Sequence, residues 1–317
     1  MVVALGGNAL LKRGQIPDAA IQKTNIEVAV RALVPLAMEH ELVITHGNGP
    51  QVGVLALQSA ADPNLTIPYP FDVLGAQTQG MIGYWLLQAF QNQLQGRQIA
   101  CILNQTLVSV VDPAFANPTK FIGEIYTEAQ AHTLANDRKW TVKADGEHWR
   151  RVIASPAPLR VVETKLIRLL LEAQSVVVCA GGGGVPVIRN EAGFLEGIEA
   201  VVDKDFTTAL LAEALDADAL LILTDVANVS LNFGMPEEEP IGRTTPSVLR
   251  EQDFPAGSMG PKVEAACRFV ERTGQMAGIG RLEDAQAILA GTAGTILTPA
   301  GDRSRSNGLT ARTEGMQ

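Results

Sequence analysis

The chain has 317 residues, with 46% hydrophobic and only 5% aromatic residues, 30 glycines and a formal net charge of −9 at pH 7. This composition is typical of an α/β enzyme, and the length suffices for one large domain or two lobes. The acidic balance, with a pI near 5.0, argues against nucleic acid or an anionic membrane as a bulk partner. A local cluster of lysines and backbone N–H groups can still bind a small anion.

Targeting segments and cysteine sites are not indicated. No uninterrupted apolar run approaches the roughly 20 residues that a membrane helix needs. The chain enters a strand pattern at once, without the segments of a secretory leader. Cys101, Cys179 and Cys267 are scattered without CxxC spacing, so neither a disulfide framework nor a zinc site is indicated. We therefore expect a soluble cytoplasmic protein with no membrane or nucleic-acid partner.

Strands followed by glycine-rich loops organise the first hundred residues. The apolar run at 2–5 leads into Gly6-Gly7-Asn8, and the run at 42–45 leads into His46-Gly47-Asn48-Gly49. Helical patterns follow both loops, and this βαβ alternation predicts a parallel sheet with helices on both faces. The elements expected in this half are a strand at 2–5, a helix at about 18–38, a strand at 42–45, helices at 51–60 and 72–95, and a strand at 99–111.

The segment at about 112–155 interrupts this alternation. It is polar and charged, contains two prolines and holds Trp140 and Trp149. Long connections inside compact domains are usually functional or disordered. We therefore expect a lid or small subdomain here, with an ordinary surface connection as the alternative.

The βα alternation returns after the excursion and continues almost to the end of the chain. Another buried strand leads into Ala180 and the four glycines at 181–184. From residue 300 the composition predicts a disordered tail. The expected elements are a helix at 162–173 with Leu166, Leu169 and Leu170 facing inward, a strand at 175–179, a helix from about 204, a strand at 219–223, a helix at 261–272, and weaker elements at 276–279 and 294–297.

The glycine loops fall where an open parallel sheet binds its ligands, beyond the carboxyl ends of the strands. Glycine there lets the backbone approach a phosphate, and the following helix presents free N–H groups. One such loop is weak support, since many turns use glycine for geometry alone, but three on one edge favour a phosphate site. The chain has neither the P-loop pattern nor Gly-x-Gly-x-x-Gly, so a P-loop enzyme or a nicotinamide Rossmann domain is disfavoured.

Three lysines stand beside glycine, proline or aspartate in segments that are otherwise poor in lysine: Lys120, Lys204 and Lys262. Phosphoryl transfer between two anions needs such positive charge, held in place. For Lys204, between Asp203 and Asp205, the alternative is a helix N-terminus capped by an aspartate with the lysine in solvent. For Lys120 the alternative is a loop lysine at the surface.

Seven motifs occur in order along the chain. These are Val-Ala-Leu-Gly-Gly-Asn-Ala at 3–9, His-Gly-Asn-Gly-Pro-Gln-Val-Gly at 46–53, Gln-Gly-Met-Ile-Gly-Tyr at 79–84, Asn-Pro-Thr-Lys-Phe-Ile-Gly at 117–123, Gly-Gly-Gly-Gly-Val-Pro-Val at 181–187, Val-Asp-Lys-Asp at 202–205 and Pro-Ala-Gly-Ser-Met-Gly-Pro-Lys at 255–262. With these residues the chain resembles the carbamate kinases, within the amino-acid-kinase superfamily, and the resemblance covers about 2–298.

The resemblance implies a three-layer α/β/α sandwich around a mainly parallel, roughly eight-stranded sheet. One domain would span 1–299, with a carbamoyl phosphate site in its N-terminal half, a protruding lid at about 112–155 and a nucleotide-binding half at about 156–299. The tail at 300–317 would lie outside it. The implied reaction is reversible phosphoryl transfer from ATP to carbamate, with Mg2+ on the nucleotide phosphates and often run towards ATP. The implied assembly is a homodimer.

The resemblance also implies roles for individual residues. The transferring phosphoryl group would be surrounded by the three lysines, with Asp205 holding them by hydrogen bonds. The carbamoyl phosphate end would lie on Gly6, Gly7, Asn8, Gly47, Asn48 and Gly49. The nucleotide would lie along Gly182, Gly183, Thr224, Asp225, Ser258, Met259 and Lys262.

Two departures from the family pattern affect the expected ribose contact and the local geometry of the lid. Thr224-Asp225 stands where many relatives have Thr-Gly, and Asp145-Gly146-Glu147-His148 replaces a glycine-arginine-glycine run in the lid. Met259-Gly260-Pro261 also resembles the branch linked to purine and allantoin breakdown, with arginine breakdown as the alternative. The alternatives are a related kinase acting on a longer carboxylate, disfavoured by the motif at 117–123, and a non-catalytic regulator, disfavoured because all three lysines and Asp205 are present.

Overall fold

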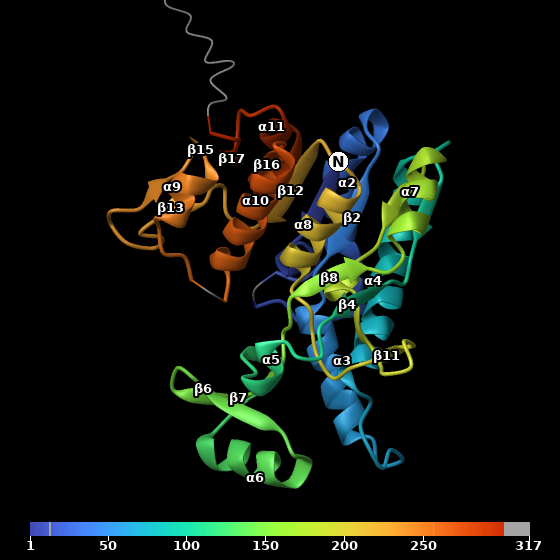
Figure 1. Cartoon of the computed structure of the whole chain (residues 1–317), viewed down its shortest axis with the longest axis vertical. Coiled ribbons are helices and arrows are strands. Elements are labelled where there is room, and N and C mark those ends of the chain that lie inside the picture. The colour runs from blue at the N-terminus through green and yellow to red at the C-terminus, as the bar shows by residue number, and fades with distance from the viewer. Residues whose placement is uncertain (13, 256, 301–317) are drawn as a thin grey trace, which may run out of the picture.

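The computed structural model describes residues 1–12, 14–255 and 257–300, so the tail expected at 300–317 lies outside the described residues except for residue 300. The main body is a sheet between layers of helices, and a smaller unit projects from it at the bottom of Figure 1. None of the helices in the described part is long and apolar enough to cross a bilayer.

The central sheet has eight strands in the order β15-β17-β16-β12-β1-β2-β9-β3. Each neighbouring pair is parallel except β16 with β17. This confirms the mainly parallel α/β fold expected from the alternation of strands and helices. The strands are β1 (Val2–Leu5), β2 (Val43–His46), β3 (Ile99–Cys101), β9 (Val176–Val178), β12 (Ala219–Thr224), β15 (Arg243–Thr244), β16 (Met276–Arg281) and β17 (Thr295–Leu297).

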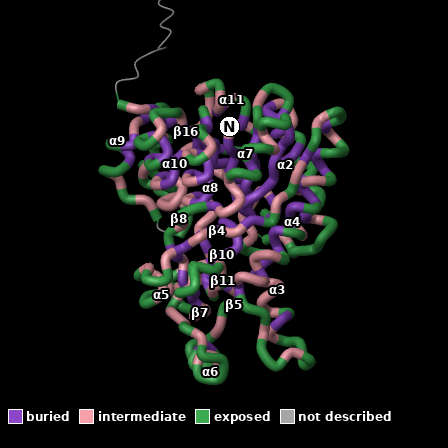
Figure 2. Tube along the Cα trace, turned by 45° about the vertical axis from the view of Figure 1, so that its right-hand side comes forward, coloured by how far each residue is buried: buried purple, intermediate pink, exposed green. Residues whose placement is uncertain are grey.

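Alternation along the buried strands divides the interior into two cores (Figure 2). Val3 and Leu5 pack into one core, and Val2 and Ala4 into the other, so both faces of β1 are covered. The first core is covered by α2 (Ala19–Glu39), α4 (Phe71–Gln93) and α11 (Ala285–Leu289), and the second by α7 (Thr164–Glu172), α8 (Lys204–Ala214) and α10 (Met259–Thr273).

The single strand expected at 99–111 is wrong. The segment forms β3 and then β4 (Gln105–Val108), which belong to different sheets. Between them, the Gln79 side chain accepts from the Asn104 N–H at 3.0 Å and donates to the Asn104 carbonyl at 3.1 Å. The Asn104 N–H therefore bonds a side chain instead of a strand, while its carbonyl also accepts from the Val185 N–H at 3.0 Å. The second sheet has the order β11 (Leu195–Gly197), β10 (Val185–Arg189), β4 and β8 (Pro158–Val161).

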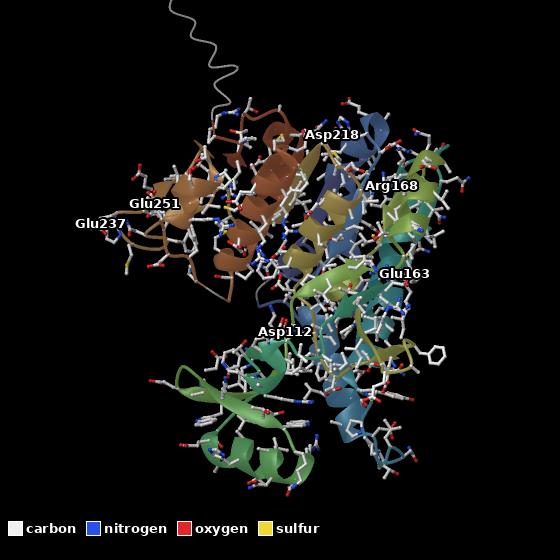
Figure 3. All side chains as sticks on the ribbon, viewed as in Figure 1. Asp112, Glu163, Arg168, Asp218, Glu237 and Glu251 are labelled. Carbon is white, nitrogen blue, oxygen red and sulfur yellow. The ribbon has the colours of Figure 1, made fainter. Side chains whose placement is uncertain are left out.

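Residues at about 112–155, which we call the lid, contain a separate antiparallel sheet with a helix against it (Figure 1). Asp112 ties the two ends of the lid to each other, because its carboxylate accepts from the N–H groups of Ala114 at 2.8 Å and Ala157 at 3.0 Å (Figure 3). The lid contains α5 (Pro113–Ala116), β5 (Lys120–Tyr126), α6 (Glu128–Arg138), β6 (Thr141–Asp145) and β7 (His148–Ile153).

The lid is packed against the body rather than held only by its ends. Ile122 and Ile153 of the lid share a small apolar core with Val52 and with Phe71 and Leu74 at the start of α4. Residues 145–148, which depart from the family pattern, form the turn between β6 and β7, and Gly146 supplies a φ of +63° there. The apolar contacts of Ile122 and Ile153 thus hold the base of the lid on the body.

The prediction that Leu166, Leu169 and Leu170 of α7 face the interior is wrong for the first two. Leu166 and Leu169 are 47% and 60% exposed, whereas Ile167 is fully buried. Leu170 packs against the core, as expected. The helix is only nine residues long, so a shift of the buried stripe by one position leaves two of its leucines in solvent. The remaining elements are α1 (Gly7–Leu10), α3 (Gly49–Ala61), α9 (Pro246–Arg250), β13 (Ser230–Leu231), β14 (Glu239–Pro240), and the short 3-10 turns η1 (Gly181–Gly183) and η2 (Leu282–Asp284).

Candidate functional site

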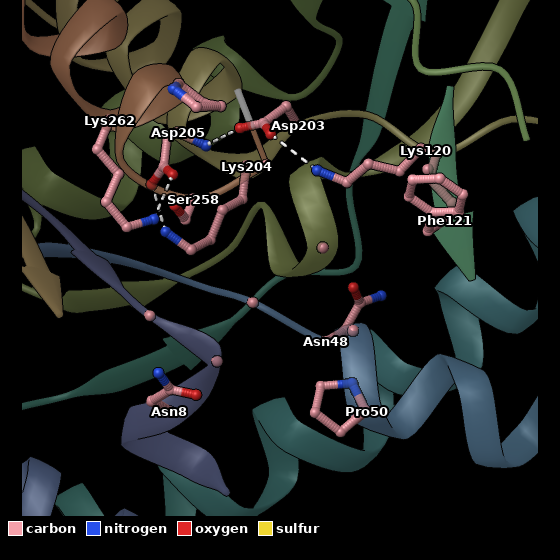
Figure 4. Close-up of a pocket in the computed structure, with 18 of the residues that line it drawn as sticks. Asn8, Asn48, Pro50, Lys120, Phe121, Asp203, Lys204, Asp205, Ser258 and Lys262 are labelled. Carbon is pink, nitrogen blue, oxygen red and sulfur yellow. Dashed lines mark hydrogen bonds and ion pairs between the residues drawn. The ribbon is translucent and has the colours of Figure 1, made fainter. Parts of the chain in front are cut away.

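A cavity of about 820 Å3 lies between the lid and the carboxyl ends of β1, β2 and β12 (Figure 4). Apart from Gly183, every site residue predicted from the sequence lines it. These residues are Gly6, Gly7, Asn8, Gly47, Asn48, Gly49, Lys120, Gly182, Lys204, Asp205, Thr224, Asp225, Ser258, Met259 and Lys262.

The Asp205 carboxylate lies at the centre of the charged groups in this cavity. One of its oxygens accepts a hydrogen bond from the Lys204 ammonium, and the other accepts from the Lys262 ammonium at 2.9 Å (Figure 4). All three side chains are largely buried, with exposures of 5% for Asp205, 11% for Lys204 and 17% for Lys262. A carboxylate shared by two ammonium groups fixes both at a set spacing.

Burial and pairing act in opposite directions on these groups. Burial opposes ionisation of Asp205, but Lys204 and Lys262 outweigh it and lower the pKa of the carboxyl to about 2. Burial lowers the pKa of Lys204, and the charge of Asp205 counters this shift. Asp205 therefore stays an anion, and the site carries fixed charge where water is largely excluded.

The start of α8 places these groups. Asp203 is the N-cap, and its carboxylate accepts from the Asp205 N–H at 2.9 Å. Thr208 in the next turn donates to the Lys204 carbonyl at 2.6 Å and exchanges a hydrogen bond with Thr45 on β2 at 2.7 Å. The helix start is thereby tied to the central sheet, and the capping alternative is correct for Asp203 alone.

Lys120 enters the cavity from the lid. It begins β5, and its ammonium donates to Asp203 at 3.1 Å (Figure 4). Lys120 is not an isolated surface lysine, because it reaches a carboxylate two residues from Asp205. Phe121 and Arg150 of the lid line the cavity beside it.

Two glycine loops form the opposite wall. A Cβ on Gly47 would lie 3.1 Å from the Gly7 nitrogen and 3.6 Å from Cε of Lys204, so the two loops and the lysine are in close approach. Asn48 donates to Thr78 at 2.8 Å. The 13-residue helix α3 starts at Gly49, and its first N–H groups provide a site suited to an anion.

In the third glycine loop, Gly183 does not line the cavity, contrary to the prediction from the sequence. Gly183 has a φ of +87°, and a Cβ there would overlap the Val202 carbonyl oxygen. The Gly183 carbonyl accepts from Thr106 at 2.7 Å and from Thr207 at 3.0 Å. Gly183 is therefore buried below the cavity, while Gly182 lines it beside Asn48.

The other end of the cavity is formed by the ends of β12 and the start of α10. Asp225, the departure after β12, accepts from Asn8 at 2.7 Å and from Thr224 at 3.2 Å, so it links the two halves of the site. The walls here are apolar and include Phe233 and Phe254. Sequence reasoning missed both phenylalanines, as it missed Arg150 and Asp203. Asp203 and Phe254 had a signal in the sequence, because they lie within or beside predicted motifs.

His46 lies under the cavity floor without reaching it. Its Nδ1 is 3.0 Å from the Gly47 carbonyl oxygen. The imidazole packs directly against Gly181, where a Cβ would overlap it. Burial lowers the pKa of His46 to about 4, the Gly47 hydrogen bond opposes this shift, and the charge of Lys204 adds to it. The imidazole is thus neutral near pH 7 and supports the Gly47 loop.

The chain is similar to proteins of one family both in sequence and in structure. The sequence profile described as the amino acid kinase family matches residues 1–279. A carbamate kinase of Rhizobium meliloti (strain 1021) is 50% identical over 94% of this chain and 93% of its own length. One of Haemophilus influenzae is 47% identical over 94% and 96%. Among solved structures, a carbamate kinase from Giardia lamblia bound to AMP-PNP is 38% identical with a TM-score of 0.87, over 94% of this chain and 98% of that one.

Because His46 is buried in its neutral form, we expect the free energy of unfolding to depend on pH. Between pH 6.5 and 4 the unfolded chain binds a proton that the folded protein excludes, so stability is full above about pH 6.5 and falls as the pH is lowered. We expect the free energy of unfolding to fall by about 2 kcal/mol from pH 6.5 to pH 5. Urea unfolding at the two pH values measures this, and the decrease should shrink in His46→Gln.

The exposed His148 in the lid provides the control. His148→Gln should keep the decrease of the wild type. An equal decrease in His46→Gln and in the wild type would show that His46 is not its source.

Proposed function

This chain belongs to the amino acid kinase family and, within it, to the carbamate kinases, and on that basis we propose that its cavity transfers a phosphoryl group reversibly between ATP and carbamate. The products are ADP and carbamoyl phosphate. The observation that carries this assignment is the arrangement of Lys204 and Lys262 on the two oxygens of Asp205. Lys120 is bound nearby to Asp203, which is two positions before Asp205 in the chain.

The three ammonium groups would stabilise the phosphoryl group in flight. Its equatorial oxygens carry the charge in the transition state, and catalysis is then mostly positioning and charge compensation. Asp205 keeps Lys204 and Lys262 from repelling each other out of position. Because these groups are fixed and buried before substrate binds, little reorganisation is needed during the reaction.

Carbamate would lie on the side of the two glycine loops. The N–H groups of Gly6 and Gly47 already donate to backbone carbonyls of β12 and β1. The other N–H groups of the loops Gly6-Gly7-Asn8 and Gly47-Asn48-Gly49, with those at the start of α3, suit an anionic carbamoyl phosphate. No general base is required, since carbamate already carries a nucleophilic oxygen anion. The neutral His46 below the floor is accordingly not assigned a proton-transfer step.

The nucleotide would occupy the other end of the cavity. Thr224, Asp225, Ser258 and Met259 line that end with apolar neighbours, and the Giardia relative is described as bound to AMP-PNP. Gly182 is also open to the cavity, whereas a contact from the buried Gly183 would have to be indirect. We propose the same division for the chain: carbamoyl phosphate on the N-terminal half, nucleotide on about 156–299, and the lid at about 112–155 over the reacting groups.

Magnesium fits this arrangement as a partner of the nucleotide phosphates. Mg2+ is usually held by substrate phosphates, waters and one or two carboxylates. Among the described residues no group of three or more His, Cys, Asp or Glu forms a protein cage, and Asp225 is a carboxylate in the cavity wall. When bound, the ion would neutralise phosphate charge. The need for ADP and ATP also supports the cytoplasmic location expected from the sequence, which stays a prediction.

The reaction itself is tested by ATP formation. We expect purified protein to make ATP from carbamoyl phosphate and MgADP, and to run the reverse reaction with ammonia, bicarbonate and MgATP. Coupled assays in both directions measure this. Labelled ATP offered to a panel of carboxylates, including N-acetylglutamate, separates carbamate from longer acceptors. Absence of turnover by folded protein, or preference for a longer acceptor, would refute the assignment.

Removal of one ammonium group tests the charge arrangement. Lys204→Ala should lower kcat by at least about 100-fold, the usual scale for losing one transition-state charge contact. Steady-state ATP formation gives the value, and circular dichroism checks folding. Lys165→Ala, an exposed lysine on α7, is the matched control and should keep wild-type kcat. Near-normal turnover by Lys204→Ala would remove Lys204 from the mechanism.

We also propose that the chain forms the homodimer implied by its family, through the β3 end of the sheet. In the described structure, β3 is an end strand and pairs only with β9. Exposed leucines lie after β3 (Leu103), on α7 (Leu166 and Leu169), which packs against the neighbouring strand β9, and on β8 (Leu159), each 47–60% exposed. Leu166 and Leu169 share one face of α7, and exposed apolar patches are typical of an interface. The two leucines that were expected inside thus gain an explanation.

Charged substitutions in this surface should separate the subunits. Leu166→Lys combined with Leu169→Lys should convert the dimer into a monomer, because burying two ammonium groups at an apolar interface is unfavourable. Light scattering after size exclusion measures the mass. Phe194→Lys, in the connection between β10 and β11 at 70% exposure, should leave the dimer intact. A wild-type monomer, or a dimer unaffected by both leucine changes, would contradict the proposal.

A further inference from the structure

Asp203 uses its two carboxylate oxygens for two different tasks. One oxygen accepts from the Asp205 N–H at 2.9 Å and caps α8. The other accepts from the Lys120 ammonium at 3.1 Å. A single side chain thus connects the helix that carries Lys204 and Asp205 to the lid strand that carries Lys120.

This contact lies at the cavity end of a continuous seam between lid and body. Arg151 of the lid pairs with Glu199 at 2.8 Å, the Val201 N–H donates to the Ala154 carbonyl at 3.0 Å, and Lys120 then meets Asp203. Of the carboxylates in the seam, Asp203 lines the cavity and Glu199 does not. Residues 199–203 therefore carry the lid contacts directly into the start of α8.

The backbone of Lys120 is fixed, but its side chain is not fixed by packing. Lys120 pairs with Ile153 in the lid sheet, and Ile122 is anchored in the apolar core shared with the body. The Lys120 side chain is nevertheless 44% exposed, against 11% for Lys204 and 17% for Lys262. An exposed lysine has four rotatable bonds, so ordering its side chain costs conformational entropy. The hydrogen bond to Asp203 is what holds the ammonium towards the cavity.

We infer that Asp203 is a positioning residue for phosphoryl transfer, which places the Lys120 ammonium beside the Asp205 cluster before substrate binds. This inference rests on the proposed function, because it assigns Lys120 to the transferring phosphoryl group. Asp203 acts through Lys120 and through charge, so its contribution is separable from its capping of α8. It belongs to catalysis more than to substrate affinity, since misplacing a group near the reacting atoms lowers the rate of the chemical step.

Asp203→Asn separates capping from positioning. Asparagine caps helices as well as aspartate does, so α8 and the thermal unfolding midpoint should be preserved. The neutral amide no longer attracts the Lys120 ammonium as a carboxylate does. We expect kcat for ATP formation to fall about 10-fold, with KM for carbamoyl phosphate changed by less than about 3-fold. Asp203→Ala should show the same loss of kcat and, in addition, a lower unfolding midpoint.

A double-mutant cycle connects the effect to Lys120. In a Lys120→Ala background, Asp203→Asn should cause no further loss of kcat. Glu199→Gln is the matched control, because it removes the other carboxylate of the seam while keeping an acceptor for the Phe71 N–H. That variant should keep kcat within about 2-fold.

The outcomes discriminate clearly. Wild-type kcat in Asp203→Asn, an equal loss with and without Lys120, or the same loss in Glu199→Gln would overturn the inference. A lower KM at unchanged kcat in Asp203→Asn would also overturn it, since Asp203 would then compete with substrate. Failure of the proposed function is a different result, namely a wild-type protein that makes no ATP from carbamoyl phosphate and MgADP.

Discussion

The site depends on one buried carboxylate that holds two ammonium groups. Without Asp205, Lys204 and Lys262 would be like charges taken out of water and brought together, and each would be driven to lose its proton or to leave the cavity. With Asp205, which stays ionised because its pKa falls to about 2, Lys204 and Lys262 are paired at exposures of only 11% and 17%. A buried ion pair adds little net stability. Its value here is the fixed direction of positive charge.

The scaffold around this carboxylate explains why the charges can be fixed so closely. Asp205 follows the N-cap of α8, and α8 is tied to the central sheet by the hydrogen bond between Thr45 and Thr208. The two glycine loops end neighbouring parallel strands, so their backbones meet beside Lys204. Phosphoryl transfer asks the protein for positioning more than for reactive groups, and a parallel sheet supplies positioning from several distant segments at one edge.

Much of the architecture could be predicted from the sequence because it is written in local patterns. The apolar runs at 2–5 and 42–45 and the loops after them predicted the parallel sheet and its ligand edge. Two predictions were wrong because contacts with other parts of the chain, which local patterns do not show, decided the outcome. Gln79 bonds the backbone of Asn104 and divides the strand expected at 99–111. Leu166 and Leu169 are exposed because α7 buries Ile167 instead, a choice of face that nine residues cannot specify alone.

Local patterns along the chain were enough to predict the order of strands and helices, the excursion between them, and the lysines and glycines of the site. These follow from short-range periodicity and from residue types that few other tasks require. Which side chains meet depends instead on the packing of the folded protein. It placed Gly183 below the cavity wall and brought Lys120 to Asp203 across 83 positions. It also turned Asp225 towards Asn8 across 217 positions. Such contacts depend on how separate elements pack, and no spacing along the chain encodes that packing.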